Sequence, residues 1–480
     1  MVLAGQFAQA QVDFDPAVDY DLSGAGPRDI VVDHFNADSA PDLAVTSAQG
    51  DGKLTVLLND GNGDFSDDQP FTVGWSAWGI ASGNLDTDSA IDLLATDGNA
   101  ASNAVYLYKG NGNGGFSALG SLTAGTFPSA VVTGQFNADT HLDIAVASGQ
   151  GGIMVFTGNG DGSFGAGSAV AEAASLAFQD LGVALLDNNA TPDLLSPRAA
   201  FLGDGQGGFS RSASFGGEVA VASGRFNNDA FSDVVAITAS QIQIWLGNGD
   251  GSFSFGSIHA PGGTLSDVAA ADLDGDQIAD VVVCDNANDR VAVLLGTGNG
   301  GLGPPQYFAT GSEPQAVAIG DWNNDQRPDL AVPFRNFGEI ARVSILLQRP
   351  AQTRAGSLQF QQGGISVEET VGSLLATVTR SGGSDGVVSV QYATANISAA
   401  ARQDYQPVSG ELVFGDGVVS RNIQLDIIDD ASPEATETFQ LSLSNPGGGA
   451  SLGNPASFVV SIAANDGPPP GPSIFDDGFE

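Results

Sequence analysis

Short apolar runs alternate with acidic and glycine-rich loops along the first 350 residues. The runs are rich in Val, Ile and Leu and about four to eight residues long, which is typical of buried β-strands. Seven of them begin at an aspartate and recur every 40 to 51 residues, at Asp42, Asp92, Asp143, Asp193, Asp233, Asp280 and Asp329. A period of this length indicates a repeat protein in which each unit forms one small sheet.

Every repeat has the same order of elements. An apolar strand runs into an acidic loop, the Asp-led strand follows, and a third strand ends in a turn of the form G-N-G-x-G-x-F. A fourth strand leads to the next repeat. Four short strands per repeat are the signature of a propeller blade, so the sequence predicts a seven-bladed β-propeller over residues 11–350. The seventh repeat lacks the glycine turn and the outer strand, and we expect residues 11–24 to supply that strand.

The acidic loop of the sixth repeat has the spacing of a metal-binding loop. Oxygen-bearing side chains stand at alternate positions in Asp272, Asp274 and Asp276, and again at Asp280. Calcium takes six to eight oxygen ligands, including backbone carbonyls. Ile278 would offer only its carbonyl, so its side chain can be apolar. The loop leads into a strand, whereas an EF-hand loop leads into a helix.

The other loops match this pattern unequally. Those of the seventh and second repeats keep the four side-chain positions, whereas the first, third and fifth begin with His34, Gln135 and Arg225. The fourth begins with Leu185 and is the least suited to a cation. The further candidate ligands are Asp321, Asn323, Asp325, Arg327 (through its carbonyl) and Asp329; Asn84, Asp86, Asp88 and Asp92; Asn36, Asp38 and Asp42; Asn137, Asp139 and Asp143; Asn227, Asp229 and Asp233. The alternative is an Asp/Asn-rich turn that caps its own backbone without metal.

The D-x-D-x-D-G-x-x-D loop and the G-x-G-x-F turn together resemble the FG-GAP/VCBS repeat propellers, such as the head of the integrin α-subunit. The resemblance covers about 340 residues and implies calcium bound by loops at one face of the ring. The glycine turns are not phosphate-binding loops, because a phosphate loop leads into a helix and every copy here leads into a strand.

The pattern changes after a polar linker at residues 351–356. About seven alternating strands follow over residues 357–467, a count typical of an immunoglobulin-like β-sandwich. The ordered set Tyr392-Ala-Thr394, Asp404-Tyr405 and Glu437-Thr-Phe439 resembles a Calx-β domain. That resemblance implies a calcium site at one end of the sandwich, formed by Glu369, Asp404, Asp429, Asp430, Glu434, Glu437 and Asp466. The last strand ends in the single acid Asp466, so the occupancy of this site stays open.

The charge balance excludes two classes of partner. Fifteen Lys+Arg against 56 Asp+Glu give a net charge of −41, which disfavours nucleic acids and anionic membrane surfaces. The single cysteine, Cys284, excludes a disulfide within the chain and stands in an apolar strand. No apolar stretch approaches the roughly 20 residues of a membrane span.

The two ends of the chain differ from the domains between them. Ala8-Gln9-Ala10 has the form of a signal-peptidase site, so residues 1–10 are interpreted as a signal-peptide remnant, with an ordinary N-terminus as the alternative. Residues 468–480 form a Pro/Gly linker and an acidic tail. We therefore expect a secreted or cell-surface protein.

No catalytic motif accompanies the acidic residues. The three histidines stand in no recognisable nucleophile arrangement, and the repeat already explains the clustered aspartates. The sequence predicts a monomeric, non-catalytic calcium-binding protein that recognises an extracellular protein or glycan. A calcium-stabilised scaffold without a ligand and, third, a polysaccharide hydrolase are the alternatives. Trp75 and Trp78, near a turn between blades, are the best candidates for stacking on sugar.

Overall fold

The structure of the protein, a computed structural model, describes residues 12–67, 70–99, 101–149, 152–173, 179–335, 341–350, 355–415, 417–431 and 435–463. The secondary structure in these ranges is β-strand except for two single 3-10 turns, η1 (Ala171–Ala173) and η2 (Glu369–Val371). The chain divides into two compact units, one of Ala10–Ala351 and one that takes in Gln352–Glu480. The predicted all-β fold class is confirmed.

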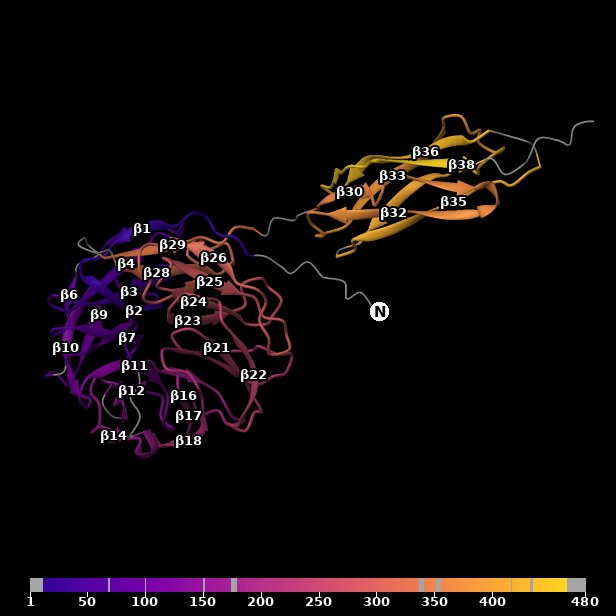
Figure 1. The fold of residues 1–480 in the computed structure, drawn as a ribbon. Helices are drawn as coiled ribbons and strands as arrows, with labels where there is room; N and C mark the ends of the chain where they lie inside the picture. The colour runs from indigo at the N-terminus through magenta and orange to yellow at the C-terminus, as the bar shows by residue number, and fades with distance from the viewer. Residues whose placement is uncertain are drawn as a thin grey trace, which may run out of the picture. The chain divides into compact units, whose positions relative to one another are not determined.

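Seven sheets form the described part of the first unit and make a ring, seen in Figure 1. The first three blades, from the inner strand outwards, are β2 (Ala25–Asp33), β3 (Asp42–Gln49), β4 (Lys53–Asn59) and β5 (Phe65–Asp67), with β6 (Phe71–Thr72) also on β4; β7 (Ala77–Gly83), β8 (Asp92–Asp97), β9 (Ala104–Gly110) and β10 (Phe116–Thr123); and β11 (Pro128–Gly134), β12 (Asp143–Ser148), β13 (Ile153–Phe156) and β14 (Ser168–Ala169).

The remaining four blades repeat this antiparallel order. They are β15 (Gly182–Ala184), β16 (Asp193–Ser196), β17 (Ala199–Gly203) and β18 (Phe209–Ser214); β19 (Val221–Gly224), β20 (Asp233–Ile237), β21 (Ile242–Gly247) and β22 (Phe253–His259); β23 (Leu265–Ala271), β24 (Asp280–Asp285), β25 (Arg290–Leu294) and β26 (Gln306–Ala309); and β27 (Ala318–Gly320), β28 (Asp329–Phe334), β29 (Arg342–Leu346) and β1 (Val18–Asp21). Each inner strand contacts the next around the ring, and β27 contacts β2, so the ring is closed.

The second strand of each blade explains the continuous apolar runs in the sequence. All residues of β8, β12, β16, β20, β24 and β28 are buried, because both faces of each sheet pack on a neighbouring blade. The cores accordingly mix residues of adjacent blades, as where Trp322 of blade 7 packs with Leu43 and Val45 of blade 1. Cys284 is fully buried in β24 as expected.

The N-terminal strand closes the ring. β1 pairs antiparallel with β29, with Val18 opposite Ile345 and Asp21 opposite Arg342. The Arg342 Nε atom lies 2.6 Å from Asp21 Oδ1. The expectation that the N-terminal segment completes the seventh blade is therefore confirmed, and Figure 1 shows β1 beside β29.

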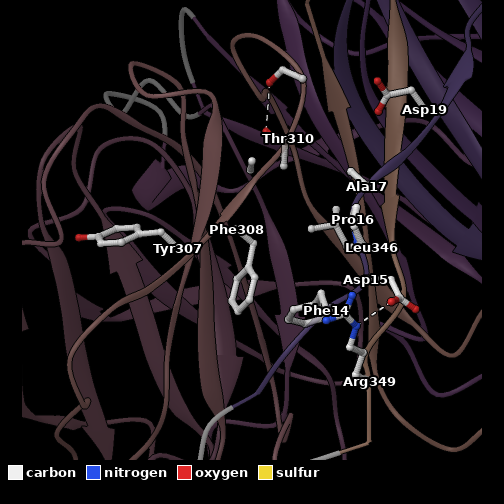
Figure 2. Close-up of a pocket in the computed structure, with 12 residues that line it drawn as sticks. Phe14, Asp15, Pro16, Ala17, Asp19, Tyr307, Phe308, Thr310, Leu346 and Arg349 are labelled. Carbon is white, nitrogen blue, oxygen red and sulfur yellow. Dashed lines mark hydrogen bonds and ion pairs between the residues drawn. The ribbon is translucent and has the colours of Figure 1, made fainter.

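Residues on both sides of β1 hold it in place. Val12, Phe14 and Leu22 are buried, and the Phe14 ring meets the Phe308 ring edge-on with centroids 4.9 Å apart. Arg349 pairs with Asp15 at 2.6 Å and with Asp13. Figure 2 shows this seam, where a hollow of about 540 Å³ lies between the N-terminal segment and β26. These contacts hold the N-terminal segment against blades 6 and 7 and so contribute to ring closure.

The second unit is a sandwich of two sheets. One sheet has the order β35 (Ser420–Asp426), β32 (Ser373–Ser381), β30 (Ser357–Phe360) and β37 (Ser451–Leu452); the other has β31 (Gly364–Glu368), β38 (Ser457–Ala463), β36 (Glu437–Gly447), β33 (Val388–Asn396) and β34 (Ser409–Phe414). Phe360, Phe414, Phe439 and Phe458 fill the core between them, and the Tyr405 ring stacks on Phe439 at 3.9 Å. The predicted immunoglobulin-like sandwich is confirmed.

Candidate metal centre

The aspartate that opens the second strand has the same structural role in all seven blades. In each, one carboxylate oxygen accepts the N–H of the residue seven positions earlier, and the other accepts an N–H from the end of the third strand or just beyond it. In blade 6, Asp280 accepts from Leu273 and Gly296, each at 2.7 Å. The recurrence of this residue needs no metal, since Asp193 does the same in the fourth repeat. Its role as a ligand, for Asp42, Asp92, Asp143, Asp233, Asp280 and Asp329, stays a prediction.

Burial of these aspartates disfavours their charged form. Desolvation raises the pKa of Asp280 to about 7 and that of Asp329 to about 6, although two backbone hydrogen bonds act in the opposite direction. A cation nearby would reverse this shift, because it favours the carboxylate.

All seven acidic loops contain turns in which a loop side chain accepts a backbone N–H two residues later. In the first repeat, the Asn36 side chain accepts the N–H of Asp38 at 2.8 Å, and Asp38 accepts the N–H of Ala40 at 2.9 Å. His34 Nδ1 lies 3.0 Å from the Ala40 carbonyl oxygen. The third, fourth and fifth repeats form the same pair of turns at Asn137 and Asp139, Asp187 and Asn189, and Asn227 and Asp229. Repeats 2, 6 and 7 form equivalent turns, at Asp86 and Asp88, Asp274 and Asp276, and Asn323 and Asp325, so the turns alone do not distinguish a loop with a cation from one without.

The loop of blade 2 contains a basic side chain. Lys109, from β9, forms ion pairs with Asp86 and Asp88, the latter at 2.9 Å. Its hydrogen bond lowers the pKa of Asp88. The Asn84 amide donates to the Asp88 carbonyl, while its buried oxygen has no hydrogen-bond partner among the described residues. The structure thus brings the predicted ligands of this loop around an ammonium group.

The loop of blade 7 is folded around Asp321, which accepts the N–H groups of Asp325 and Gln326 at 3.0 and 2.8 Å. Asn323 also accepts from Asp325, at 3.1 Å. Arg327, expected to offer only its carbonyl, also pairs its guanidinium with Asp325. One of the predicted ligands is therefore already neutralised by a cation.

The loop of blade 6 brings three acidic side chains together without a basic partner among the described residues. Asp272, Asp274 and Asp276 place carboxylate oxygens within 4.8 Å of one another, and among the described residues no other three acidic, His or Cys side chains do so. None of the ion pairs in the described ranges involves them. Burial and repulsion from Asp276 raise the pKa of Asp274. Three converging carboxylates without a partner cation fit a hard divalent ion such as calcium.

Local backbone geometry produces this convergence. Asp272 accepts the N–H groups of Gly275 and Gln277, at 2.7 and 2.8 Å, and so curls the loop around its own side chain. Gly275 and Gln277 have φ of 84° and 71°, and the glycine makes the first of these inexpensive. The Ile278 side chain is buried, as its apolar character requires. Asp280 is not part of the group of three.

The surroundings of this loop differ from those of the first five. In repeats 1 to 5 the carbonyl after the first loop position accepts an N–H from the glycine turn of the next blade, as Phe226 does from Gly300 at 2.9 Å. Blade 7 has no such turn, and the Leu273 carbonyl accepts instead from the Gln348 side chain at 2.7 Å. The loop of blade 6 therefore contacts the segment by which the chain leaves the propeller.

The predicted ligands of the sandwich are only partly brought together. Glu369 is buried and accepts the N–H of Asp430 at 3.3 Å, and the Asp404 carbonyl accepts from Ile428 at 3.0 Å, so these residues share one end of the sandwich. Within the described ranges no three sandwich carboxylates approach as closely as those of blade 6. Asp429 and Glu437 flank this end in sequence, and Glu434 and Asp466 lie outside the described residues.

Three further carboxylates lie on the innermost strands or just before them. Asp29, Asp180 and Asp267 belong to blades 1, 4 and 6, and each accepts an N–H from the next blade, of Ile80, Val221 and Val317 respectively. Burial raises the pKa of Asp29 to about 6 and of Asp180 to about 7, and it raises that of Asp267 as well. Repulsion from Asp29 adds to the shifts of the other two.

These groups should make stability depend on pH. A raised pKa means that the folded state holds protons that the unfolded state has lost, so the stabilisation is complete below about pH 4 and is lost as the pH rises through 6 to 7. One pKa unit corresponds to about 1.4 kcal/mol. We expect Asp180→Asn to reduce the loss of stability between pH 5 and 8 by at least ~1 kcal/mol.

Denaturant unfolding at several pH values measures this effect. Asp51→Asn removes an equal charge from an exposed loop and should leave the pH dependence of wild type unchanged. Equal slopes for Asp180→Asn and wild type would contradict the assignment.

Sequence reasoning missed the basic groups in the loops. Lys109 directly precedes Gly110, the residue whose N–H donates to Asp92 in blade 2. The residues at the equivalent position of the other six blades are Leu58, Thr157, Leu202, Leu246, Leu295 and Leu347. Comparison of the third strands would therefore have singled out Lys109. Of the aromatic candidates, Trp75 is 68 % exposed, whereas Trp78 packs on Phe127 and beneath Arg28.

Comparison with known protein families agrees with both folds. Residues 34–95, 84–146, 225–283 and 272–332 match the FG-GAP-like repeat, and residues 352–466 match the Calx-beta domain. The propeller therefore contains FG-GAP-like repeats, and the sandwich is a Calx-beta domain. Among the described residues, no helix is long and apolar enough to cross a membrane.

Individual curated relatives match a part of this chain. The adhesion G-protein coupled receptor V1 of Danio rerio is 37% identical over 111 residues, 23% of this chain and 2% of the receptor. The sodium/calcium exchanger Calx of Drosophila melanogaster is 32% identical over 134 residues, 28% of this chain and 13% of the exchanger. The solved apo-form Calx CBD1 domain is 32% identical with a TM-score of 0.23, covering 23% of this chain and 97% of that domain. The chain thus spans a small fraction of these curated relatives.

Proposed function

We propose that this protein is a secreted or cell-surface recognition or adhesion protein that binds calcium and performs no catalysis. The observation that carries the proposal is the loop of blade 6, where three carboxylates converge within 4.8 Å with no basic partner among the described residues. Such an arrangement is unfavourable without a cation, because like charges repel most where burial reduces screening.

Calcium would act on the loop and on the segment beside it. It would neutralise Asp272, Asp274 and Asp276 and take a backbone carbonyl, in our prediction that of Ile278. Because the Leu273 carbonyl holds the Gln348 side chain, ordering this loop would also order the exit of the chain from the propeller. The ion is structural in this proposal, and recognition belongs to the propeller surface.

The comparisons support this proposal. Related sequence occurs in a protein named as an adhesion receptor and in one named as a sodium/calcium exchanger. The sandwich is proposed as a second calcium site, at the end where Glu369, Asp404 and Asp430 lie near one another. Trp75, exposed beside a turn of blade 2, is the side chain we propose for contact with a glycan.

Recognition can be tested with arrays of glycans and extracellular proteins, in millimolar calcium and in chelator. We expect binding in calcium that chelator abolishes and that Asp274→Asn with Asp276→Asn weakens at least several-fold. Trp75→Ala should reduce binding to a glycan ligand without changing thermal stability, because the side chain is mostly solvated. Absence of any binding in calcium would favour the scaffold alternative, and binding that is unchanged by chelator would contradict calcium dependence.

A further inference from the structure

One loop with the predicted ligand spacing already contains a cation from its own chain. Asp86, Asp88 and Asn84 belong to the acidic loop of blade 2, and the ammonium of Lys109 lies between the two carboxylates. Asp86 is largely buried there, with 9% of its side chain exposed, whereas 39% of the lysine side chain is exposed. The charged group reaches the loop from the third strand of the same blade.

The comparison of blades shows that this lysine is an exception. The equivalent residue is leucine in blades 1, 4, 5, 6 and 7 and threonine in blade 3. In blade 6 the equivalent Leu295 brings no charge, and there the three carboxylates have no basic partner among the described residues. A basic side chain at this position and an unpaired acidic cluster therefore occur in different blades.

We infer that Lys109 is a tethered cation that takes the place of calcium in the loop of blade 2. The Lys109 ammonium pairs with the same two carboxylates that would bind the ion. Because the lysine is anchored in β9, the loop needs no metal ion from solution. The inference rests on the proposed function only in taking loops of this kind as calcium sites. Its consequence is that blade 2 keeps its loop closed at any calcium concentration, whereas blade 6 does not.

Removing the ammonium should turn the loop into a calcium site. Lys109→Leu supplies the residue found in five other blades, so the fold should tolerate it. The loop would then present Asp86, Asp88 and the Asn84 oxygen, which is buried and without a partner among the described residues. This loop would offer calcium few charged ligands and would not be rigid, so we expect weak calcium binding, with a dissociation constant of about 10⁻⁴ to 10⁻³ M.

The test is the number of calcium ions bound by the full chain, measured by equilibrium dialysis at several millimolar calcium. We expect Lys109→Leu to bind one more ion than wild type, and Lys109→Leu with Asp88→Asn to lose it again. Lys53→Leu, which removes the only other lysine from an unrelated part of blade 1, should bind as many ions as wild type. Lys109→Gln, which keeps a polar side chain without the charge, gives a second variant should the leucine impair folding.

Two outcomes would overturn the inference. One is an unchanged ion count in both folded Lys109 variants, and the other is a lower count for Asp88→Asn alone, which would mean that calcium already displaces the lysine. Failure of the proposed function is a separate result: wild type and Asp274→Asn with Asp276→Asn would bind equal numbers of ions. A gain in Lys109→Leu would then support the inference for blade 2 independently of blade 6.

Discussion

Thermal unfolding in millimolar calcium should occur several degrees above unfolding in chelator. An ion that binds only the folded state stabilises it by about 4 kcal/mol when its concentration is a thousand times the dissociation constant. Asp274→Asn with Asp276→Asn should remove the part of this gap that comes from the propeller, because it leaves one of the three converging carboxylates of blade 6. Calorimetry of the full chain can follow the propeller and the sandwich as separate transitions.

The matched control is Asp187→Asn with Asp51→Asn, which removes the same charge from a loop that closes on itself and from an exposed turn. These changes should leave the calcium-dependent gap of the propeller unchanged. Coincident curves for wild type in calcium and chelator would show that the acidic loops are turns only. The propeller fold would be unaffected by that result.

Loss of the anchors of β1 should destabilise the propeller as strongly as loss of calcium. Leu22→Ala should cost about 2–5 kcal/mol and Phe14→Ala about 3–5 kcal/mol, because each deletes a buried side chain from a packed cluster between blades. Both lie in the segment that supplies the outer strand of blade 7. Urea unfolding followed by tryptophan fluorescence suits this measurement, since Trp322 lies in the same cluster as Leu22.

Val18→Ala is the appropriate comparison for these two variants. Val18 belongs to β1 itself but is 53% exposed, so its truncation should change stability by about 0.5 kcal/mol or less. Equal effects at Val18 and Leu22 would mean that packing on both sides of β1 does not hold the ring closed.

The repeat pattern predicted the architecture because each level of the sequence agreed with the others. Apolar runs bounded by turns specify strands, their period specifies blades, and the missing outer strand of the seventh repeat identified the segment that completes it. The positions of the loop oxygens in blade 6 were also predictable, since alternate spacing and Gly275 determine where the side chains point.

Whether an acidic loop is paired with a basic side chain of the protein was not predictable from the loop sequence alone. Lys109 lies 17 residues after Asp92, and only the pairing of β8 with β9 brings it to the loop. Arg327 was considered for its carbonyl, whereas its side chain folds back on Asp325. The aspartate that opens the second strand of each blade accepts backbone N–H groups and also stands at a ligand position of the motif. The sequence motif does not distinguish these two roles. In blade 2 the ion pair comes from Lys109, a residue outside the motif. In blade 7 it comes from the side chain of Arg327, a residue inside the motif that was expected to contribute only its carbonyl.

The pairing of β1 with β29 has a consequence for the time at which the propeller can form on the ribosome. The two strands are joined by the whole ring, so Val18 leaves the ribosome long before Ile345 does. At about 5–20 residues per second this delay lasts tens of seconds, during which the apolar side chains of Phe14 and Leu22 lack their final contacts. Translation speed and chaperones that shield the nascent N-terminal segment should therefore influence the yield of this protein more than they influence its final stability.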